Sequence, residues 1–491
     1  MDPKTFRTSA PEASDELISD PTQSWTLALT AVAALLVGLD ALVVSTALST
    51  IRTELGASLE QLEWTVNAYV LSFAVLMMTA SALGDRFGRR RLFVAGLRLF
   101  AAASAACAVA PDAGFLIAAR AVQGAGAALI MPLALALLSD AFSPPARQRA
   151  IGIFSGVLGV AVPVGPLLGG AVVDGVAWPW IFWLNLPIAL TVAALARSRV
   201  RESFGPPAAV DMPGLALATG GAFAIVWGLV RGNSGGWSSA EVLVALIGGG
   251  LLTVAFVAWE LRAAEPMLPM GLFRSARFSA GNAAMFLLWG SALGSLFFMA
   301  QFLQTGLGRG PLAAGLGLMP WGATTVFVPP IVGGVINRVG ERPLILVGLG
   351  LNAAAMAWIA LIAAPDLAYW RLVAPLVMSG TGIAMASPAA LSSVMSSVAP
   401  QFIGKASGTF STLRQLGGAF GVAVGVAVFT AAGGYASPEQ FSDGFSAAIG
   451  ACAGLSLLGA VAGLALPRRR EDNGMQRAGA RPVAALETEG R

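Results

Sequence analysis

The sequence contains no histidine and only two cysteines, and both shortages narrow its chemistry. Histidine is the commonest metal ligand and the usual side chain that titrates near neutral pH. Cys107 and Cys452 lie in separate apolar runs without CxxC spacing, which favours helix packing over a disulfide or thiol chemistry. We therefore expect no metal and no cofactor, and any proton-handling group must be a carboxylate.

Charged residues are also scarce: they make up 11% of the 491 residues, whereas hydrophobic residues make up 56%. A soluble domain has about 25% charged residues, so this composition excludes a large soluble enzyme and predicts a polytopic protein embedded in a lipid bilayer. The net charge of +4 follows the membrane topology and indicates no nucleic-acid partner. A membrane enzyme would need clustered catalytic groups near an interface, and the sparse acids argue against one.

Apolar runs of about 18 residues or more recur along the chain, and each is long enough to span the hydrocarbon of a bilayer. They predict about fourteen helices, at 25–49, 62–83, 92–110, 115–139, 152–173, 180–196, 213–230, 242–259, 278–302, 312–336, 344–363, 372–398, 406–432 and 445–466. Most loop arginines fall in the alternate loops that share a side with the N-terminus. The positive-inside rule then places both termini in the cytoplasm.

An internal repeat predicts how these helices are organised. SALGDRFGRRRLFVAG (81–96) aligns with GGVINRVGERPLILVG (333–348), and QGAGAALIMP (123–132) aligns with SGTGIAMASP (379–388). Parallel six-helix repeats with a substrate site between the halves are typical of transporters. We expect an all-α polytopic fold that divides as follows: a disordered cytoplasmic tail at 1–24, a six-helix bundle at 25–198, a linker with two additional helices at 199–277, a second six-helix bundle at 278–466, and a disordered cytoplasmic tail at 467–491.

One acidic residue lies inside the first apolar run. Asp40 stands in WTLALTAVAALLVGLDALVVSTALS (25–49), and no other acid lies well inside a long apolar run. A carboxylate at such a depth costs a few kcal/mol on insertion scales, so an intramembrane acid indicates a functional site and usually has a partner. Arg120, near the outer end of the fourth run, lies at a similar depth at 1.5 Å per residue. The two are expected to pair for proton coupling, the alternative being that Arg120 only organises packing.

The loop GDRFGRRR (84–91) is the most specific local motif, with glycines for a tight turn and arginines for the cytoplasmic face. It resembles the cytoplasmic loop motif of the major facilitator superfamily, although Ser81 replaces the usual first glycine. The resemblance implies a gating charge network here, and we expect it to involve Gly84, Asp85, Arg86, Gly88, Arg89, Arg90 and Asp140. A solvated end of the fourth helix is the alternative for Asp140.

Further motifs resemble the fourteen-helix drug:proton antiporter family of this superfamily. RAVQGAGAA (120–128) resembles the superfamily's fourth-helix motif, and VPVGPLLGG (162–170) resembles the fifth-helix motif associated with antiporters. The motifs that resemble the fourteen-helix family are LDALVVSTAL (39–48), EWTVNAYVL (63–71), WPWIFWLNLP (178–187) and RQLGGAFGVAV (414–424). In that family the arginine that matches Arg120 is implicated in proton transfer. Asn67 and Tyr69 are candidates to line the substrate cavity, together with Arg414 from the last of these motifs.

The fifth helix carries the segment that the family associates with antiport. Its small and helix-bending residues are Pro163, Gly165, Pro166, Gly169 and Gly170. The residues themselves indicate a bent helix that neighbours approach closely. The resemblance implies that this segment limits leak and favours exchange.

Together these features predict proton-coupled efflux of a drug-like or natural-product molecule by alternating access, without enzymatic activity. The expected partners are a small lipophilic substrate and protons, the expected location is a bacterial plasma membrane, and we expect a functional monomer. A facilitator or importer on the same fold, in which Asp40 binds substrate and no proton, is the alternative. The identity of the substrate does not follow from the sequence.

Overall fold

The computed structural model of the protein describes residues 21–205, 211–264, 266–399 and 402–467, and these residues form helices and no strands. Most of the two predicted tails lies outside this part of the chain. Residues 21–24 were assigned to the first tail, and this was wrong, because the first helix begins at Pro21. The side-chain amide of Gln23 donates to Ala141 O at 3.0 Å, which satisfies a polar group at this helix end.

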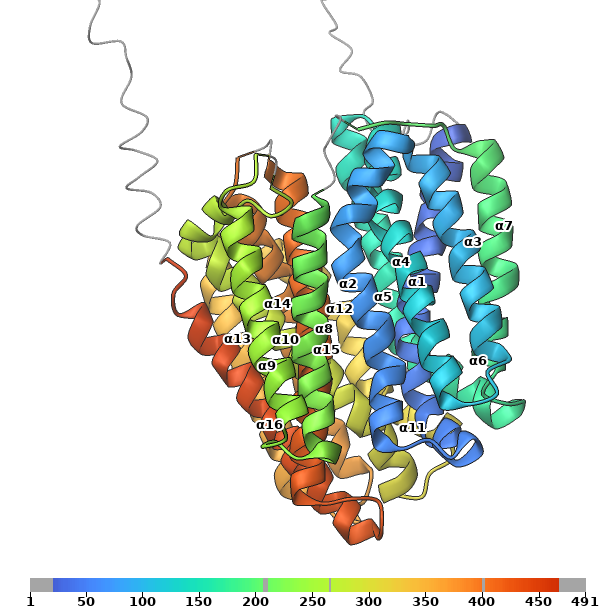
Figure 1. The fold of residues 1–491 in the computed structure, drawn as a ribbon, viewed down its shortest axis with the longest axis vertical. Helices are drawn as coiled ribbons and strands as arrows, with labels where there is room; N and C mark the ends of the chain where they lie inside the picture. Colours follow the sequence, from blue (N-terminus) through green and yellow to red (C-terminus); the bar gives the residue numbers. More distant parts are fainter. Residues whose placement is uncertain (1–20, 206–210, 265, 400–401, 468–491) are drawn as a thin grey trace, which may run out of the picture.

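The helices form two groups, which we call the first half (α1–α7) and the second half (α10–α16), with α8 and α9 between them in sequence (Figure 1). The helices of the first half are α1 (Pro21–Leu55), α2 (Leu59–Phe87), α3 (Arg89–Ala108), α4 (Ala113–Ala141), α5 (Pro144–Gly175), α6 (Trp180–Trp183) and α7 (Asn185–Arg199). The remaining helices are α8 (Met212–Gly235), α9 (Ala240–Glu260), α10 (Ala276–Gln301), α11 (Pro311–Gly317), α12 (Met319–Val339), α13 (Glu341–Ile362), α14 (Trp370–Ser396), α15 (Ile403–Ala432) and α16 (Pro438–Gly463). Two short turns, η1 (Met270–Arg274) and η2 (Phe302–Gly306), flank α10.

Twelve of the fourteen predicted runs each largely coincide with one helix, and the polytopic all-α fold is confirmed. Thirteen helices of the described part are long and apolar enough to cross a membrane. The helix α2 adds a fourteenth if its segments Leu59–Met77 and Thr79–Phe87, which meet at a bend of 50°, count as one span. The sixth and tenth predicted runs are each broken in two because Pro187 and Pro320 lack the N–H that would continue the helix.

Glycine contacts reproduce the sequence repeat in three dimensions. A Cβ added to Gly96 would lie 3.2 Å from Gly126 O, between α3 and α4, and one added to Gly348 would lie 2.6 Å from Gly382 O, between α13 and α14. Equivalent glycines therefore bring equivalent helix pairs close together in the two halves. The connection between helices is repeated too. Gly88 and its counterpart Gly340 join consecutive helices with positive φ angles of 108° and 90°, a conformation that favours glycine.

Along α5 the two halves meet at one end of the bundle and separate toward the other, whereas α2 and α15 stay in contact. We call the end at which α1 begins and α16 ends the terminal face, and the other end the opposite face. A Cβ added to Gly170, near the opposite face, would lie 2.3 Å from Pro311 O of α11. Further back along α5, the nearest atom at Gly159 is 4.0 Å away, and Gly156 and Gly152 have nothing within 4 Å. Along α5 the first half therefore diverges from the second toward the terminal face.

Polar contacts join the halves at the opposite face. The guanidinium carbon of Arg52, in α1, lies 3.7 Å from the ring centre of Tyr435, and Gln304 Nε2 donates to Thr46 O at 3.0 Å. Burial raises the pKa of the Tyr435 hydroxyl, which donates to Gln301 Oε1. These contacts link α1 to η2 and to the connection between α15 and α16, so the opposite face is closed.

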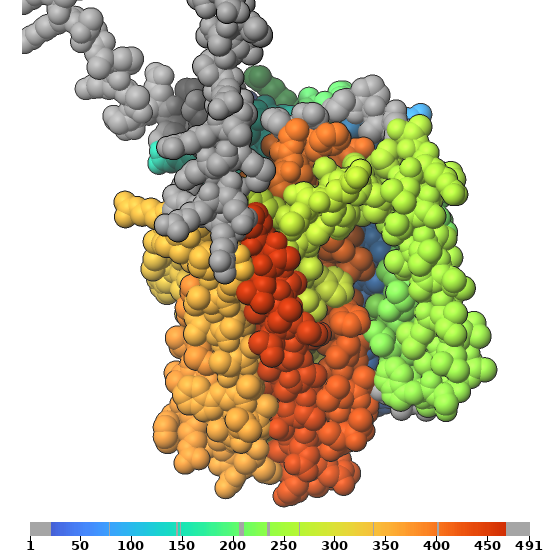
Figure 2. Space-filling model, turned by 90° about the vertical axis from the view of Figure 1, so that its left-hand side faces the viewer, coloured from blue at the N-terminus to red at the C-terminus, as the bar shows by residue number. Residues whose placement is uncertain are grey.

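The inserted pair α8–α9 stands at the side of the bundle. The helix α8 packs against α9, α15 and α2, and Figure 2 shows the yellow-green pair as a column beside the orange and red helices of the second half. Much of α9 is exposed and apolar, including Val244, Ile247, Leu251 and Val254. Such a surface suits contact with lipid, as the prediction of an additional membrane-spanning pair requires.

Candidate functional site

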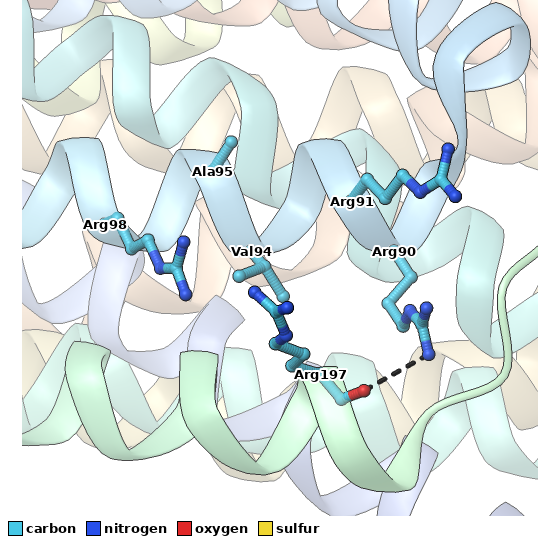
Figure 3. A pocket seen from close by; sticks show the side chains of 6 residues that line it. All are labelled: Arg90, Arg91, Val94, Ala95, Arg98 and Arg197. Atoms are coloured by element: carbon cyan, nitrogen blue, oxygen red, sulfur yellow. Dashed lines mark hydrogen bonds between the residues drawn. The ribbon is translucent and has the colours of Figure 1, made fainter.

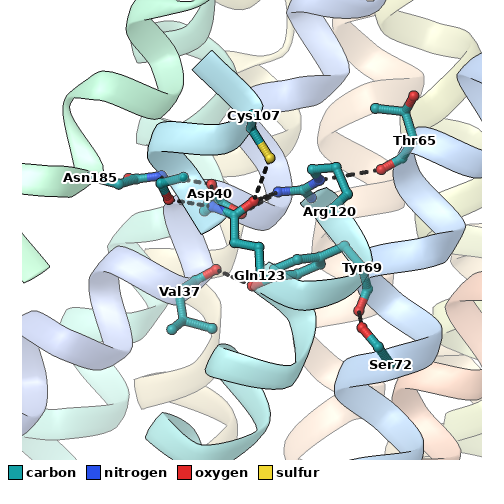
Figure 4. A network of polar contacts seen from close by, with 10 residues as sticks. Val37, Asp40, Thr65, Tyr69, Ser72, Cys107, Arg120, Gln123 and Asn185 are labelled. Atoms are coloured by element: carbon teal, nitrogen blue, oxygen red, sulfur yellow. Dashed lines mark hydrogen bonds and ion pairs between the residues drawn. The ribbon is translucent and has the colours of Figure 1, made fainter. Parts of the chain in front are cut away.

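Asp40 lies at the centre of a buried polar cluster in the first half. It belongs to α1, where its side chain is 1% exposed. The carboxylate accepts three hydrogen bonds: from Arg120 Nη1 at 2.6 Å, from Gln123 Nε2 at 2.8 Å and from Asn185 Nδ2 at 2.7 Å (Figure 4). The expected pairing of Asp40 with Arg120 is therefore present. Three donors therefore compensate the buried carboxylate for the water that it has lost.

The guanidinium of Arg120 is held on several sides. Besides Asp40, it donates to Gln123 Oε1 at 2.6 Å and to Thr65 O at 3.3 Å. Its central carbon lies 4.1 Å from the ring centre of Tyr69 and 5.7 Å from that of Phe182. A buried cation held by a carboxylate, carbonyl and amide oxygens and aromatic faces is largely compensated for leaving water.

Three members of this cluster were missed at the sequence level. Gln123 and Asn185 donate to Asp40, and the hydroxyl of Ser104 accepts from both amides, at 2.7 and 3.4 Å. A signal was available for Gln123, which follows Arg120 by three residues and so shares its helix face. Asn185 begins α7, directly after the break before Pro187. No sequence pattern marked it or Ser104.

The second half contains a neutral counterpart of this cluster. Asn352 of α13 donates to Ser291 of α10 at 2.9 Å and to Ser456 of α16 at 2.8 Å, and it accepts from Ser379 of α14 at 2.6 Å. These helices correspond by the repeat to α3, α1, α7 and α4, and Ser379 aligns with Gln123. Equivalent helices therefore hold a polar cluster in each half, although Asn352 itself aligns with Phe100. Of the two clusters, only that of the first half contains an ion pair.

The loop between α2 and α3 forms a charge cluster at the terminal face. Arg89 Nε donates to Asp85 Oδ1 at 2.7 Å, and Arg89 also pairs with Asp140 at the end of α4. The backbone N–H of Arg90 donates to Glu202 Oε1 at 2.8 Å. Gly88 adopts its positive φ here, and a Cβ at Gly84 would lie 2.1 Å from Leu133 Cδ2. Of the predicted set, Arg86 instead lies 5.3 Å from the ring of its neighbour Phe87.

The predicted antiporter segment lies at two interfaces at once. Added Cβ atoms at Gly165 and Gly169 would lie 2.7 Å from Leu42 Cβ and 2.5 Å from Val43 O of α1, within the first half. The other three residues face the second half: Gly170 lies against Pro311, Pro163 against Gly322, and Pro166 against Gly315. Both prolines lie inside α5, as expected.

The two candidate cavity residues of α2 are both fully buried in this structure. The Tyr69 hydroxyl donates to Val37 O at 3.3 Å, and its ring packs under Arg120, so Tyr69 belongs to the Asp40 cluster. Both polar atoms of the Asn67 side chain are without a hydrogen-bond partner in the described part of the chain. One turn earlier lies Glu63, which is fully buried with both carboxylate oxygens unpartnered there.

Glu63 is a second buried acid of the first half, at the edge of the predicted run 62–83. It lies only four residues after the start of α2 at Leu59, close to the end of the helix. Packing of α2 against its neighbours buries it. An unpaired buried carboxylate is costly unless it is neutral or finds a partner.

Arg414 lies in the second half beside Trp289. Its guanidinium carbon is 5.3 Å from the centre of the Trp289 ring. Arg414 Nε and Trp289 Nε1 are both buried donors without an acceptor among the described residues. Within the same ranges, no group of three or more Cys, Asp or Glu side chains is placed to hold a metal ion.

Comparison with known proteins supports one family. The model of the Major Facilitator Superfamily matches residues 30–422. The tetracenomycin C resistance and export protein of Streptomyces glaucescens is 33% identical over 85% of this chain and 78% of its own length. The cephamycin export protein CmcT of Amycolatopsis lactamdurans is 36% identical, over 86% and 88%, and the puromycin resistance protein pur8 of Streptomyces alboniger is 34% identical, over 90% and 91%.

Solved structures agree at the level of the fold. A crystal structure of the peptide transporter POT in complex with sulfate superposes with a TM-score of 0.66 at 17% sequence identity, over 91% of this chain and 96% of that one. The family match, the relatives and the helix arrangement confirm the resemblance seen in the motifs. The chain is a multi-pass membrane transporter and belongs to the major facilitator superfamily.

Proposed function

We propose that this transporter exports drug-like or natural-product molecules in exchange for protons. The proposal rests on the buried Asp40 carboxylate, whose three donors come from α4 and α7. A rearrangement of either helix would remove donors from the carboxylate and favour its protonation. The relatives that carry resistance and export names support the direction of transport and the class of substrate.

Alternating access would couple this site to the substrate. In the structure the halves are joined at the opposite face by Gly170 and Arg52 and diverge along α5 toward the terminal face. If the terminal face is cytoplasmic, as the loop arginines favour, this arrangement loads substrate from the cytoplasm. In the alternative arrangement, which is open at the opposite face, Asp40 would take up a proton from outside. Proton and substrate would then compete for occupancy of the transporter. Driving one proton inward contributes about 2.3 kcal/mol per 100 mV.

The two halves and the site residues have separate proposed roles in transport. We propose that residues 25–198 and 278–466 move as units, that Asp40 and Arg120 couple protons, and that the cluster of Asp85, Arg89 and Asp140 gates the terminal face. Substrate would bind between the halves, where Arg414 and Trp289 offer unpartnered donors to its oxygen or nitrogen atoms. The proposed location is the bacterial plasma membrane, and the proposed functional unit is a monomer.

A test of this function uses everted membrane vesicles that contain the wild-type protein. Puromycin, tetracenomycin C and a cephamycin are suitable probes because relatives are named for them. We expect at least one probe to accumulate in energised vesicles and to release protons from their lumen when added. Accumulation should vanish when an ionophore collapses the pH gradient and the membrane potential. Transport that is unaffected by the ionophore would indicate a facilitator instead.

Closure of the opposite face should depend on the absence of a side chain at Gly170. In Gly170→Ala the new methyl group would lie 2.3 Å from Pro311 O, a backbone atom that cannot move aside alone. Overpacking of this kind costs about 1–3 kcal/mol, so the population with an open opposite face should rise about tenfold. The reporter is Gln304→Cys, at a half-buried position whose side chain contacts Thr46 O across the halves; opening would appear as faster labelling by a membrane-impermeant maleimide.

The matched control is Gly175→Ala at the end of the same helix, where nothing lies within 4 Å of the added methyl group. The native cysteines, Cys107 and Cys452, are both buried and should react slowly. Equal labelling rates in the two alanine variants would contradict the proposed role of Gly170 in closure.

A further inference from the structure

A groove on the outer surface of the first half is lined by four arginines. It lies between α3 and α7 near the terminal face, has a volume of about 430 Å³, and is lined by Arg90, Arg91, Val94, Ala95, Arg98 and Arg197. Figure 3 shows the side chains of Arg90, Arg98 and Arg197 in the space between the two helices, with Val94 among them. The groove is separate from the Asp40 cluster and from the interface between the halves.

The positive charge of this groove is only partly compensated. Arg90 donates to Arg197 O at 3.2 Å and to Val200 O at 3.1 Å. Arg90 and Arg91 share one carboxylate, that of Glu202, at 3.5 Å each. The side chains of Arg98 and Arg197 have neither a hydrogen bond nor an ion pair with any residue that the structure describes. Four cations therefore face one anion, and two of the cations are free to bind a ligand.

The depth of Arg98 makes an unpaired guanidinium costly. Arg98 follows Arg89, the first residue of α3, by nine residues, so it lies about 13 Å along the helix from the terminal face. Its side chain is exposed on the outside of the bundle, which in a membrane protein is the side of the lipid. A cation at this depth must reach back to the interface or bind an anion that reaches it.

A phosphate ester anchored in the membrane satisfies these requirements. Guanidinium groups bind phosphate oxygens in a bidentate manner, and basic pockets between membrane helices on the cytoplasmic side suit anionic lipid headgroups. Val94 and Ala95 form an apolar floor between the arginines, along which an acyl chain can lie. We infer that this groove is a binding site for an anionic phospholipid of the leaflet at the terminal face, with Arg98 and Arg197 as the phosphate ligands.

The test measures lipid retention on the purified full-length protein by native mass spectrometry. The probes are phosphatidylglycerol, phosphatidylcholine and inorganic phosphate, each titrated into the protein in neutral detergent. The wild-type protein should retain phosphatidylglycerol in preference to phosphatidylcholine. The double variant Arg98→Gln/Arg197→Gln should bind phosphatidylglycerol about thirty-fold more weakly, if each arginine contributes about as much as a basic residue at a membrane surface.

Two further variants separate this site from general charge and from misfolding. Arg262→Gln/Arg274→Gln removes two exposed arginines near α9 and η1 and should leave retention unchanged. Arg98→Lys/Arg197→Lys keeps the charge but loses the bidentate geometry, and its binding should lie between those of the wild type and the glutamine variant. Equal weakening in the distant control, or no weakening in the groove variant, would overturn the inference. Preferential binding of inorganic phosphate with the same arginine dependence would assign the groove to a free phosphate and overturn the lipid source.

Discussion

Replacing Asp40 by asparagine is expected to abolish proton-driven accumulation of substrate while leaving substrate exchange intact. Asparagine keeps the size of the side chain and can still accept from Arg120, but it does not carry a proton on and off. With one proton exchanged for each neutral molecule, a gradient of one pH unit and 100 mV supplies about 3.7 kcal/mol. Its loss would lower the accumulation ratio on the order of several hundredfold.

The measurement uses everted vesicles and the compound that the wild-type protein exports. Energised uptake reports coupling, and exchange between labelled and unlabelled substrate in de-energised vesicles reports whether the protein is folded and able to alternate. Asp366→Asn is a suitable control, because Asp366 is an exposed acid in the connection between α13 and α14. Accumulation that persists at the wild-type level in Asp40→Asn would remove Asp40 from the coupling mechanism.

Removing the positive partner should damage the fold more than Asp40→Asn does, because the asparagine oxygen can still accept from Arg120 whereas leucine offers Asp40 no donor. In Arg120→Leu the Asp40 carboxylate stays buried and keeps only its two amide donors. Breaking a buried ion pair from one side costs about 3–5 kcal/mol because an uncompensated charge remains. We therefore expect a clear fall in the melting temperature of the purified protein and a lower yield in the membrane.

The double variant Asp40→Asn/Arg120→Leu provides the decisive comparison. It removes both charges and should recover a large part of the lost stability, although it should not transport against a gradient. Thermal unfolding of the two single variants and the double variant gives their coupling energy directly. Arg371→Leu, at an exposed position beside Trp370, controls for the loss of an arginine as such. Additive losses in the double variant would show that the two residues contribute independently.

Much of the architecture was predictable because a lipid bilayer restricts which backbone structures can cross it. Long apolar runs predicted every membrane-spanning helix, and the charged loops with their glycines predicted the repeat. The pair of Asp40 and Arg120 was predictable as well, since two buried ions at a similar depth on adjacent helices stabilise each other. Each of these inferences depends only on local composition and on position along a helix axis.

The rest of the site depends on how helices rotate about their axes and pack. Asn185 reaches Asp40 because α7 starts anew before Pro187 at the depth of the cluster, and no apolar pattern encodes that convergence. The burial of Glu63 depends on packing in a related way: it lies near the start of α2, and neighbouring helices enclose it. Side-chain partners across four helices follow from tertiary packing and not from depth alone.

The neutral cluster around Asn352 has a mechanical consequence. Because this cluster consists of neutral serine and asparagine side chains, whereas the Asp40 cluster contains an ion pair, protonation of Asp40 would alter the electrostatic energy of the first half alone. The proton gradient and the membrane potential would then act on the first half, and the second half would not respond to them directly. Two halves of similar shape would thus have different roles: the first would move in response to protonation, and the second would be the part relative to which it moves.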